Sequence, residues 1–207
     1  MRTYFFKNPW WLAKFYHKAI FSIPDSEGIY LTFDDGPNET VTPWVLDQLK
    51  KYNAKATFFL IGKMAEKYPE LVKRIINEGH SIGGHTYRHT SGWQLSSEAY
   101  YKEINEGLDV IPKTKLFRPP YGHIRLNQLT HLTRQDLETI MWSHLSGDFD
   151  RSVNKEASLN VMKCAEPGSI LVFHDSQKAF ENLTYMLPRV LDHFSTLRLS
   201  LKALPQI

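Results

Sequence analysis

Two adjacent acids, Asp34 and Asp35, directly follow the apolar run at residues 29–33. Neighbouring carboxylates repel each other, so a site that keeps both ionised needs a metal or another cation near one and a donor near the other. His85 and His89 are spaced i and i+4, which brings two imidazoles within reach of one ion if the intervening turn is helix-like. We therefore predict that Asp35, His85 and His89 bind a divalent metal, Zn²⁺ first, with Co²⁺, Ni²⁺ or Fe²⁺ as alternatives.

Three further polar segments also follow strand-like apolar runs. Arg118 and His174 each come directly after such a run, and the segment 143–148 follows the run at 139–142. Every candidate side chain therefore sits at the carboxyl end of a predicted strand. A barrel whose catalytic face is built from the loops after its strands explains this placement better than scattered polar positions do.

The alternation of apolar runs with helical patterns is typical of βα units around a parallel sheet or barrel. We expect seven strands, near residues 29, 56, 81, 115, 139, 169 and 197. The first helix is predicted to have Thr42 as its cap and Pro43 as its first residue, and a second to run from Pro69 to Gly79. Further helices are expected at residues 97–109, 154–165 and 179–194.

The motifs TFDDGP, HTYRH, RPPYG and LVFHD, in this order, resemble those of the polysaccharide deacetylases, the NodB homology domain or family four carbohydrate esterases. The resemblance extends over roughly residues 28–200 and implies a distorted (β/α)7 or (β/α)8 barrel in a single domain. The fourth motif departs from the family pattern of Asp, two residues, Asp, Trp. Here Leu145 replaces the first acid and Phe149 replaces the Trp, while Asp148 is kept, so the effect on activity or substrate choice is left open.

The motifs also predict roles for the remaining polar residues. Asp34 is the expected general base that accepts a proton from water activated by the metal. Arg118 is expected to orient Asp34, as the third motif does in relatives. The backbone N–H of Tyr121, which follows two prolines, is a candidate donor to the oxyanion. His174 is the expected general acid for the amine leaving group, kept protonated by Asp148.

Length and composition favour one domain, and the resemblance implies that its catalytic barrel is at residues 28–207, preceded by an aromatic and basic segment at residues 1–27. The chain has 207 residues, 42% of them hydrophobic, which is ample for one core. The net charge is +3, with basic and acidic residues interspersed rather than gathered into a stripe. This pattern argues against nucleic acid as a partner, and the sequence specifies no oligomeric state.

The N-terminal segment contains no uninterrupted apolar stretch, because Lys7, Asn8, Pro9 and Lys14 break it up. We therefore predict neither a cleavable signal peptide nor a membrane-spanning helix. The segment is expected to pack on the domain, with peripheral binding to a membrane surface as the alternative. The corresponding localisation is cytoplasmic or inner-membrane-associated.

The leading functional hypothesis is a metal-dependent hydrolase that removes N-linked acetyl groups from the sugars of a glycan, either peptidoglycan or a chitin-type oligomer. The second hypothesis is a deacylase of another acylated carbohydrate or small amide, because the motifs specify the reaction and not the sugar. The third is a catalytically weak barrel that binds glycan, which is motivated by Leu145 and Phe149.

Overall fold

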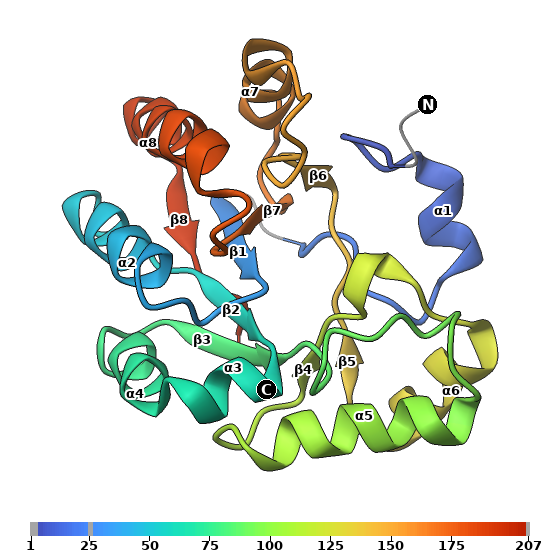
Figure 1. Cartoon of the computed structure of the whole chain (residues 1–207). Coiled ribbons are helices and arrows are strands. Elements are labelled where there is room, and N and C mark those ends of the chain that lie inside the picture. The colour runs from blue at the N-terminus through green and yellow to red at the C-terminus, as the bar shows by residue number, and fades with distance from the viewer. Residues whose placement is uncertain (1–3, 25–26, 206–207) are drawn as a thin grey trace.

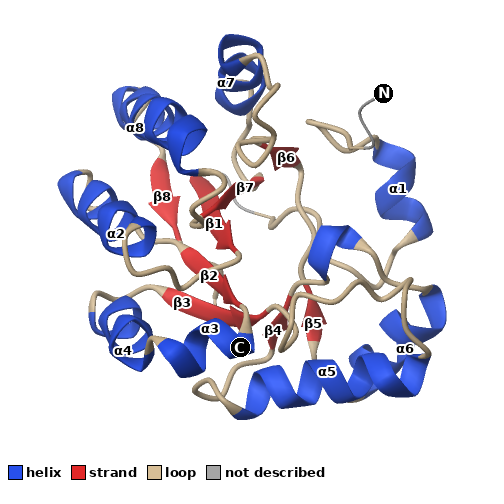
Figure 2. Cartoon of the chain, in the orientation of Figure 1, coloured by secondary structure: helices blue, strands red, loops and turns tan. Residues whose placement is uncertain are grey.

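The computed structural model describes residues 4–24 and 27–205. A parallel sheet, curved into an open barrel, forms its centre, and helices cover its outer face (Figure 1; Figure 2). The strands follow the order β5-β4-β3-β2-β1-β7-β6, and β8 also pairs with β1. They are β1 (Gly28–Asp34), β2 (Thr57–Leu60), β3 (Ser81–Gly84), β4 (Leu116–Phe117), β5 (Glu138–Thr139), β6 (His144–Leu145), β7 (Ile170–His174) and β8 (Ser200–Lys202). The predicted distorted barrel is confirmed.

All the helices except α1, which precedes β1, lie between successive strands of the chain. They are α1 (Trp10–Phe15), α2 (Val41–Lys51), α3 (Gly62–Lys67), α4 (Pro69–Asn77), α5 (Ser97–Asp109), α6 (Leu126–Arg134), α7 (Lys155–Lys163) and α8 (Phe180–Thr196). The helices expected at residues 97–109, 154–165 and 179–194 are present as α5, α7 and α8. Among the described residues, no helix has both the length and the apolar character that crossing a membrane requires.

The seven expected strands are present as β1 to β5, β7 and β8, and β6 is an eighth strand that was not predicted. The run at residues 139–142 does not form one strand, because Met141 donates its backbone N–H to Ile20 of the N-terminal segment at 2.7 Å instead of continuing along the sheet. Pairing within the sheet resumes at β6. The last strand begins at Ser200 rather than near residue 197, because α8 continues to Thr196.

The predicted cap of α2 is also wrong. The helix begins at Val41, and the Asn38 side chain accepts hydrogen bonds from the N–H groups of Thr40 and Val41 at 3.0 Å each. The Asn38 side chain therefore satisfies two of the free donors at this helix end. Thr42 lies inside the first turn, and its hydroxyl donates to the buried carboxylate of Asp175 at 2.5 Å.

The N-terminal segment lies between the two edge strands of the open sheet, β5 and β6. Lys7 forms an antiparallel bridge with His144, and Ile20 forms a parallel bridge with Ile140. In Figure 1 this blue segment runs beside β6 and then carries α1 past the rim of the barrel. The segment thus satisfies backbone groups at edges that would otherwise be exposed.

The core lies on both faces of the central strands, and all seven residues of β1 are buried. Continuous burial is expected for a parallel strand covered on both faces, and it explains why residues 29–33 are apolar apart from Thr32. The Phe33 ring stacks between those of Phe58 and Phe173, at centroid distances of 5.2 and 5.8 Å. This packing fixes the strand end that carries Asp34 and Asp35.

Candidate active site

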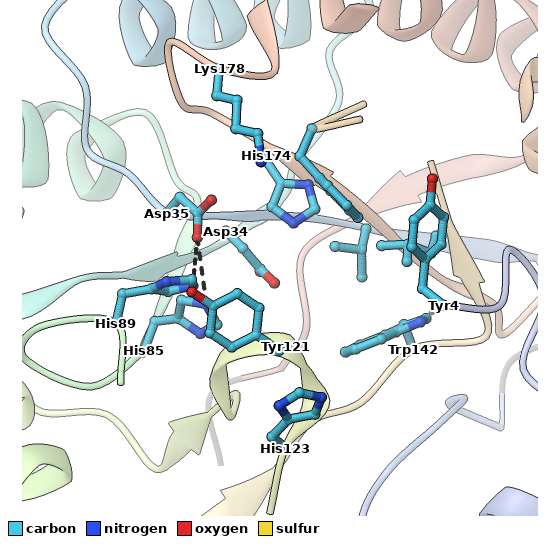
Figure 3. Close-up of a pocket in the computed structure, with 13 residues that line it drawn as sticks. Tyr4, Asp34, Asp35, His85, His89, Tyr121, His123, Trp142, His174 and Lys178 are labelled. Atoms are coloured by element: carbon cyan, nitrogen blue, oxygen red, sulfur yellow. Dashed lines mark ion pairs between the residues drawn. The ribbon is translucent and has the colours of Figure 1, made fainter. Parts of the chain in front are cut away.

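Asp35, His85 and His89 come together at the carboxyl ends of β1 and β3 (Figure 3). Asp35 Oδ1 lies 3.1 Å from His89 Nε2 and 3.7 Å from His85 Nε2. Oδ1 is buried, and apart from these two nitrogens no donor in the described part of the chain reaches it. A buried carboxylate oxygen that faces two imidazole nitrogens is a donor set that fits a divalent cation.

The protonation states of the cluster also fit a cation. Nδ1 of His85 donates to the carbonyl oxygen of Arg118 at 2.7 Å, which leaves the lone pair of Nε2 directed at Asp35. Burial lowers the pKa of His85 to about 4, against the opposing charge of Asp34, so the ring is neutral at pH 7. Burial disfavours the charge of Asp35, but hydrogen bonding by His89 and the nearby imidazoles outweigh it and lower its pKa.

The turn between the two histidines is not helix-like. Residues 85–89 form a loop in which Thr86 and His89 have φ angles of 59° and 60°. Tyr87 donates its backbone N–H to the carbonyl oxygen of Glu103 on α5, at 2.9 Å, so packing on a distant helix shapes the loop. The two imidazole centroids nevertheless lie 5.0 Å apart.

Asp34 forms a buried ion pair with Arg118. Asp34 Oδ1 accepts from Arg118 Nη1 at 2.8 Å, and the arginine is 0% exposed. Arg118 also donates to the Thr32 hydroxyl at 2.6 Å and to the carbonyl oxygens of Ile140 and Met141 at 3.2 and 3.0 Å. A guanidinium bonded to four acceptors cannot reorient, so it fixes the orientation of the Asp34 carboxylate.

His174 and Asp148 form a second buried pair. Nδ1 of His174 donates to Asp148 Oδ1 at 2.7 Å, and the backbone N–H of His174 donates to Oδ2 at 2.9 Å. Burial opposes the imidazolium, but the charge of Asp148 and its hydrogen bond outweigh this and raise the pKa of His174 to about 9. The ring is therefore protonated near pH 7, and among the described residues none forms a hydrogen bond with its Nε2, which leaves this atom for a substrate.

Tyr121 lies at the mouth of the site and is 61% exposed. Its φ angle is 61°, and its ring centroid is 4.6 Å from that of His89. Its backbone N–H donates no hydrogen bond within the described residues. The two prolines before it fix the backbone and carry no N–H of their own, so Tyr121 is the first donor this turn offers.

These side chains meet around one cavity of about 430 Å³ (Figure 3). Six of the eight predicted site residues line it: Asp34, Asp35, His85, His89, Tyr121 and His174. Arg118 and Asp148 are not part of the lining and lie directly behind Asp34 and His174. Other lining residues had no predicted role, among them Tyr4, His123, Trp142 and Lys178. Of these four, Trp142 could have been identified from the sequence, because it ends an apolar run next to the fourth motif.

The altered fourth motif is packed against the N-terminal segment. The Phe149 ring lies edge-on to His174 at 4.9 Å and to Tyr4 at 5.2 Å, and the Tyr4 hydroxyl donates to Asp150 at 2.8 Å. Gly147 has a φ angle of 65°, and a Cβ atom there would approach the Phe6 ring at 2.9 Å. Tyr4 and Phe6 thus occupy space beside the position where relatives usually carry Trp.

Asp175 supports the loop that carries the adjacent acids. It is 0% exposed, and a Cβ atom on Gly36 would lie 2.1 Å from its Oδ2. Burial raises the pKa of Asp175 to about 7, although its hydrogen bond with Thr42 opposes this and the charge of Asp35 adds to it. Its contacts make Asp175 a packing partner of the loop after β1 rather than only a cap of its own loop.

A model of the family described as "Polysaccharide deacetylase" matches residues 22–140, more than half of the chain. The chain belongs to the polysaccharide deacetylase family. This family member is 39% identical over 172 residues to a peptidoglycan-N-acetylglucosamine deacetylase of Bacillus cereus. The match covers 80% of this chain and 62% of the relative, so the chain spans about three fifths of the relative's length.

Solved structures of the family share the barrel. A peptidoglycan N-acetylglucosamine deacetylase in complex with an N-oxidanyl-benzamide aligns with a TM-score of 0.85 at 35% identity, covering 94% of both chains. A mutant of a carbohydrate esterase pseudoenzyme with restored activity aligns with a TM-score of 0.79 at 25% identity, covering 90% of this chain and 69% of the other. Because a pseudoenzyme shares this barrel, the fold alone does not establish catalysis, which depends on the side chains of the site.

We expect His85→Ala to lose both stoichiometric metal and hydrolysis, because it removes one of three clustered donors. Metal per chain, by atomic absorption, and acetate release measure the two effects. His80→Ala is a matched control, since His80 is also buried but precedes the opposite end of β3. Full metal content together with full hydrolysis in His85→Ala would contradict this ligand assignment.

We expect Phe149→Trp, which restores the usual family residue, to destabilise the fold by about 1–3 kcal/mol through overpacking against Tyr4. In the double variant with Tyr4→Ala, the loss should be smaller than the sum of the single losses by about 0.5 kcal/mol or more. Denaturant unfolding of the four proteins measures this coupling. Strict additivity would show that the two rings do not compete for space.

Proposed function

We propose that this chain is a metal-dependent hydrolase that removes acetyl groups from N-acetylated sugars of a peptidoglycan-type glycan. The observation that carries the proposal is the arrangement of a carboxylate fixed by arginine and a protonated imidazole around one cation site in one cavity. Amide hydrolysis needs an acceptor for the water's proton and a donor for the leaving amine. The deacetylase relatives support acetylated glycan as the substrate.

We assign Asp35, His85 and His89 as the ligands of the cation, with Zn²⁺ the favoured ion and Co²⁺, Ni²⁺ or Fe²⁺ as alternatives. When bound, a cation of this kind polarises the acetyl carbonyl and acidifies water. The oxygen donor and the two nitrogen donors leave coordination positions open, as a catalytic site requires.

Different residues around this site accept a proton from the water and donate a proton to the leaving amine. Asp34 accepts the proton of the attacking water, because Arg118 occupies Oδ1 and no described residue bonds to the other oxygen. The Tyr121 N–H donates to the oxygen of the tetrahedral intermediate. His174 delivers its Nε2 proton to the departing amine, while Asp148 holds the ring by Nδ1.

A panel of acetylated substrates tests this proposal. Purified protein is freed of metal, reconstituted with Zn²⁺ or Co²⁺, and assayed for acetate release from peptidoglycan, N-acetylglucosamine oligomers, acetylated xylan and small acetamides. Release from the first two is the expected result. Release only from other acylated carbohydrates or small amides would favour the broader deacylase hypothesis. Binding of oligomers without any release would favour the glycan-binding barrel.

We further propose that the N-terminal segment binds an anionic membrane surface and holds the protein at the inner membrane. Four of its aromatic side chains are between 51% and 72% exposed: Phe5, Trp10, Trp11 and Phe15. Residues 1–24 contain several Lys residues but no Asp or Glu. Exposed aromatic rings beside lysines suit the interface of anionic lipids.

Co-sedimentation with vesicles tests the membrane proposal. The protein should pellet with vesicles that contain phosphatidylglycerol, more than with phosphatidylcholine alone, and 0.5 M salt should weaken binding. The double variant Trp10→Ala/Trp11→Ala should lose most binding. Leu197→Ala, which removes a different exposed apolar side chain, should bind like the wild type. Equal binding by the double variant and the wild type would refute the assignment.

A further inference from the structure

A series of rings extends from the cation site to an outer surface. The His89 ring lies 4.6 Å from that of Tyr121, and the Tyr121 ring lies 5.6 Å from that of His123, which also lines the cavity. The indole of Trp93 stacks on His123 with a centroid distance of 3.8 Å and an interplanar angle of 7°. Trp93 is 52% exposed, so the stack buries one part of the indole and leaves the rest open to solvent.

The loop that carries Trp93 is held firmly in place. The guanidinium of Arg125 donates to the carbonyl oxygens of Trp93 and Leu95 at 2.8 Å each. The Ser91 hydroxyl forms a hydrogen bond with Nδ1 of His123 at 3.1 Å, which fixes the ring beneath the indole. A large apolar side chain that is both immobilised and half exposed has lost conformational freedom without gaining full burial. Such preorganisation is typical of a binding surface.

We infer that Trp93, stacked on His123, forms a subsite for a sugar ring that neighbours the acetylated sugar in a glycan chain. This inference rests on the proposed function. Pyranose rings present apolar C–H faces that pack on flat aromatic surfaces while their hydroxyl groups stay hydrated. Three ring-to-ring steps separate Trp93 from His89, so a sugar on Trp93 is not the one whose acetyl group reaches the cation site. The ligand class is therefore an oligomer and not a single sugar.

Chain-length dependence tests the subsite. Acetate release is measured on N-acetylglucosamine oligomers of two to six sugars for the wild type, Trp93→Ala and Trp93→Phe. Trp93→Ala should lower kcat/KM about tenfold on the long oligomers, mainly through KM, and much less on the shortest one. Trp93→Phe, which keeps a flat ring over His123, should recover most of the loss. Leu197→Ala, at the far end of α8, serves as the control that leaves every rate unchanged.

The same loss on all chain lengths would overturn the inference, because it would indicate a structural role for Trp93. Undiminished rates on the longest oligomers would overturn it as well. If the wild type releases no acetate from any oligomer, the proposed function fails but the subsite is still tested. Titration of tryptophan fluorescence with the six-sugar oligomer, which Trp142 in the cavity can also report, should then show weaker binding by Trp93→Ala than by the wild type, and equal affinities would reject the subsite.

Discussion

Asp34→Asn is expected to keep its metal and to lose hydrolysis by a factor of about 10²–10⁴. The amide oxygen can still accept a hydrogen bond from Arg118, so the geometry is largely kept. The amide cannot accept the water's proton. Because Arg118 is 0% exposed, its charge would lose its partner, and we also expect a stability loss of about 3 kcal/mol. Metal content and acetate release are therefore measured well below the unfolding transition of the variant.

Asp47→Asn provides the matched control for this experiment. Asp47 is a solvent-exposed carboxylate on α2 that pairs with Arg74 at 2.6 Å, remote from the cavity. Its variant should keep both metal and turnover. Loss of metal from Asp34→Asn, with metal kept in the control, would make Asp34 a ligand rather than the base.

His174→Ala is expected to lower hydrolysis of amide substrates by a factor of about 10²–10⁴ and of activated acetyl esters far less. The physical reason is the leaving group. An amine must be protonated before it departs, whereas a nitrophenolate leaves without a proton, so the acid matters only for the amide. Rates on an N-acetylglucosamine oligomer and on 4-nitrophenyl acetate, measured for one preparation, provide the comparison. Equal losses on both substrates would remove His174 from the role of acid.

Asp148→Asn is expected to move the alkaline limb of the pH–rate profile to lower pH. The acid form of His174 dominates below its pKa, which Asp148 raises to about 9 against the effect of burial. A bound cation would oppose this increase, so the limb of the metal-loaded enzyme should lie below pH 9. Removing the carboxylate removes the main group that raises the pKa, and activity is then lost at lower pH. An unmoved limb would show that another group controls it.

Most of the barrel and of the candidate site followed from local sequence patterns. Buried parallel strands read as apolar runs, and the polar residues that end them share one edge of the sheet, so six of the residues that line the cavity could be named in advance. The cap of α2 was missed because Thr42 and Asn38 are both favoured cap types. Contact with Asp175, far along the chain, placed Thr42 inside the helix.

Long-range contacts account for the other differences. Tyr4 bonds with Asp150 across 146 positions, so no local pattern could place it in the cavity. The loop that carries His85 and His89 takes its shape from Glu103 on α5 and not from its own spacing. The strand predicted at residues 139–142 was interrupted because the N-terminal segment competes for its backbone groups. Local sequence patterns identify the residues that carry the chemistry, whereas the backbone conformation between these residues depends on tertiary packing.

Metal titration of the metal-free protein tests directly whether one bound cation per chain is required for hydrolysis. Zn²⁺ is added in steps while acetate release from an N-acetylglucosamine oligomer is followed. We expect no release without metal, then a linear rise with added Zn²⁺ that saturates at one ion per chain, and no rise for His85→Ala. Full release from the metal-free protein, or no release at saturating Zn²⁺ and Co²⁺, would contradict this expectation.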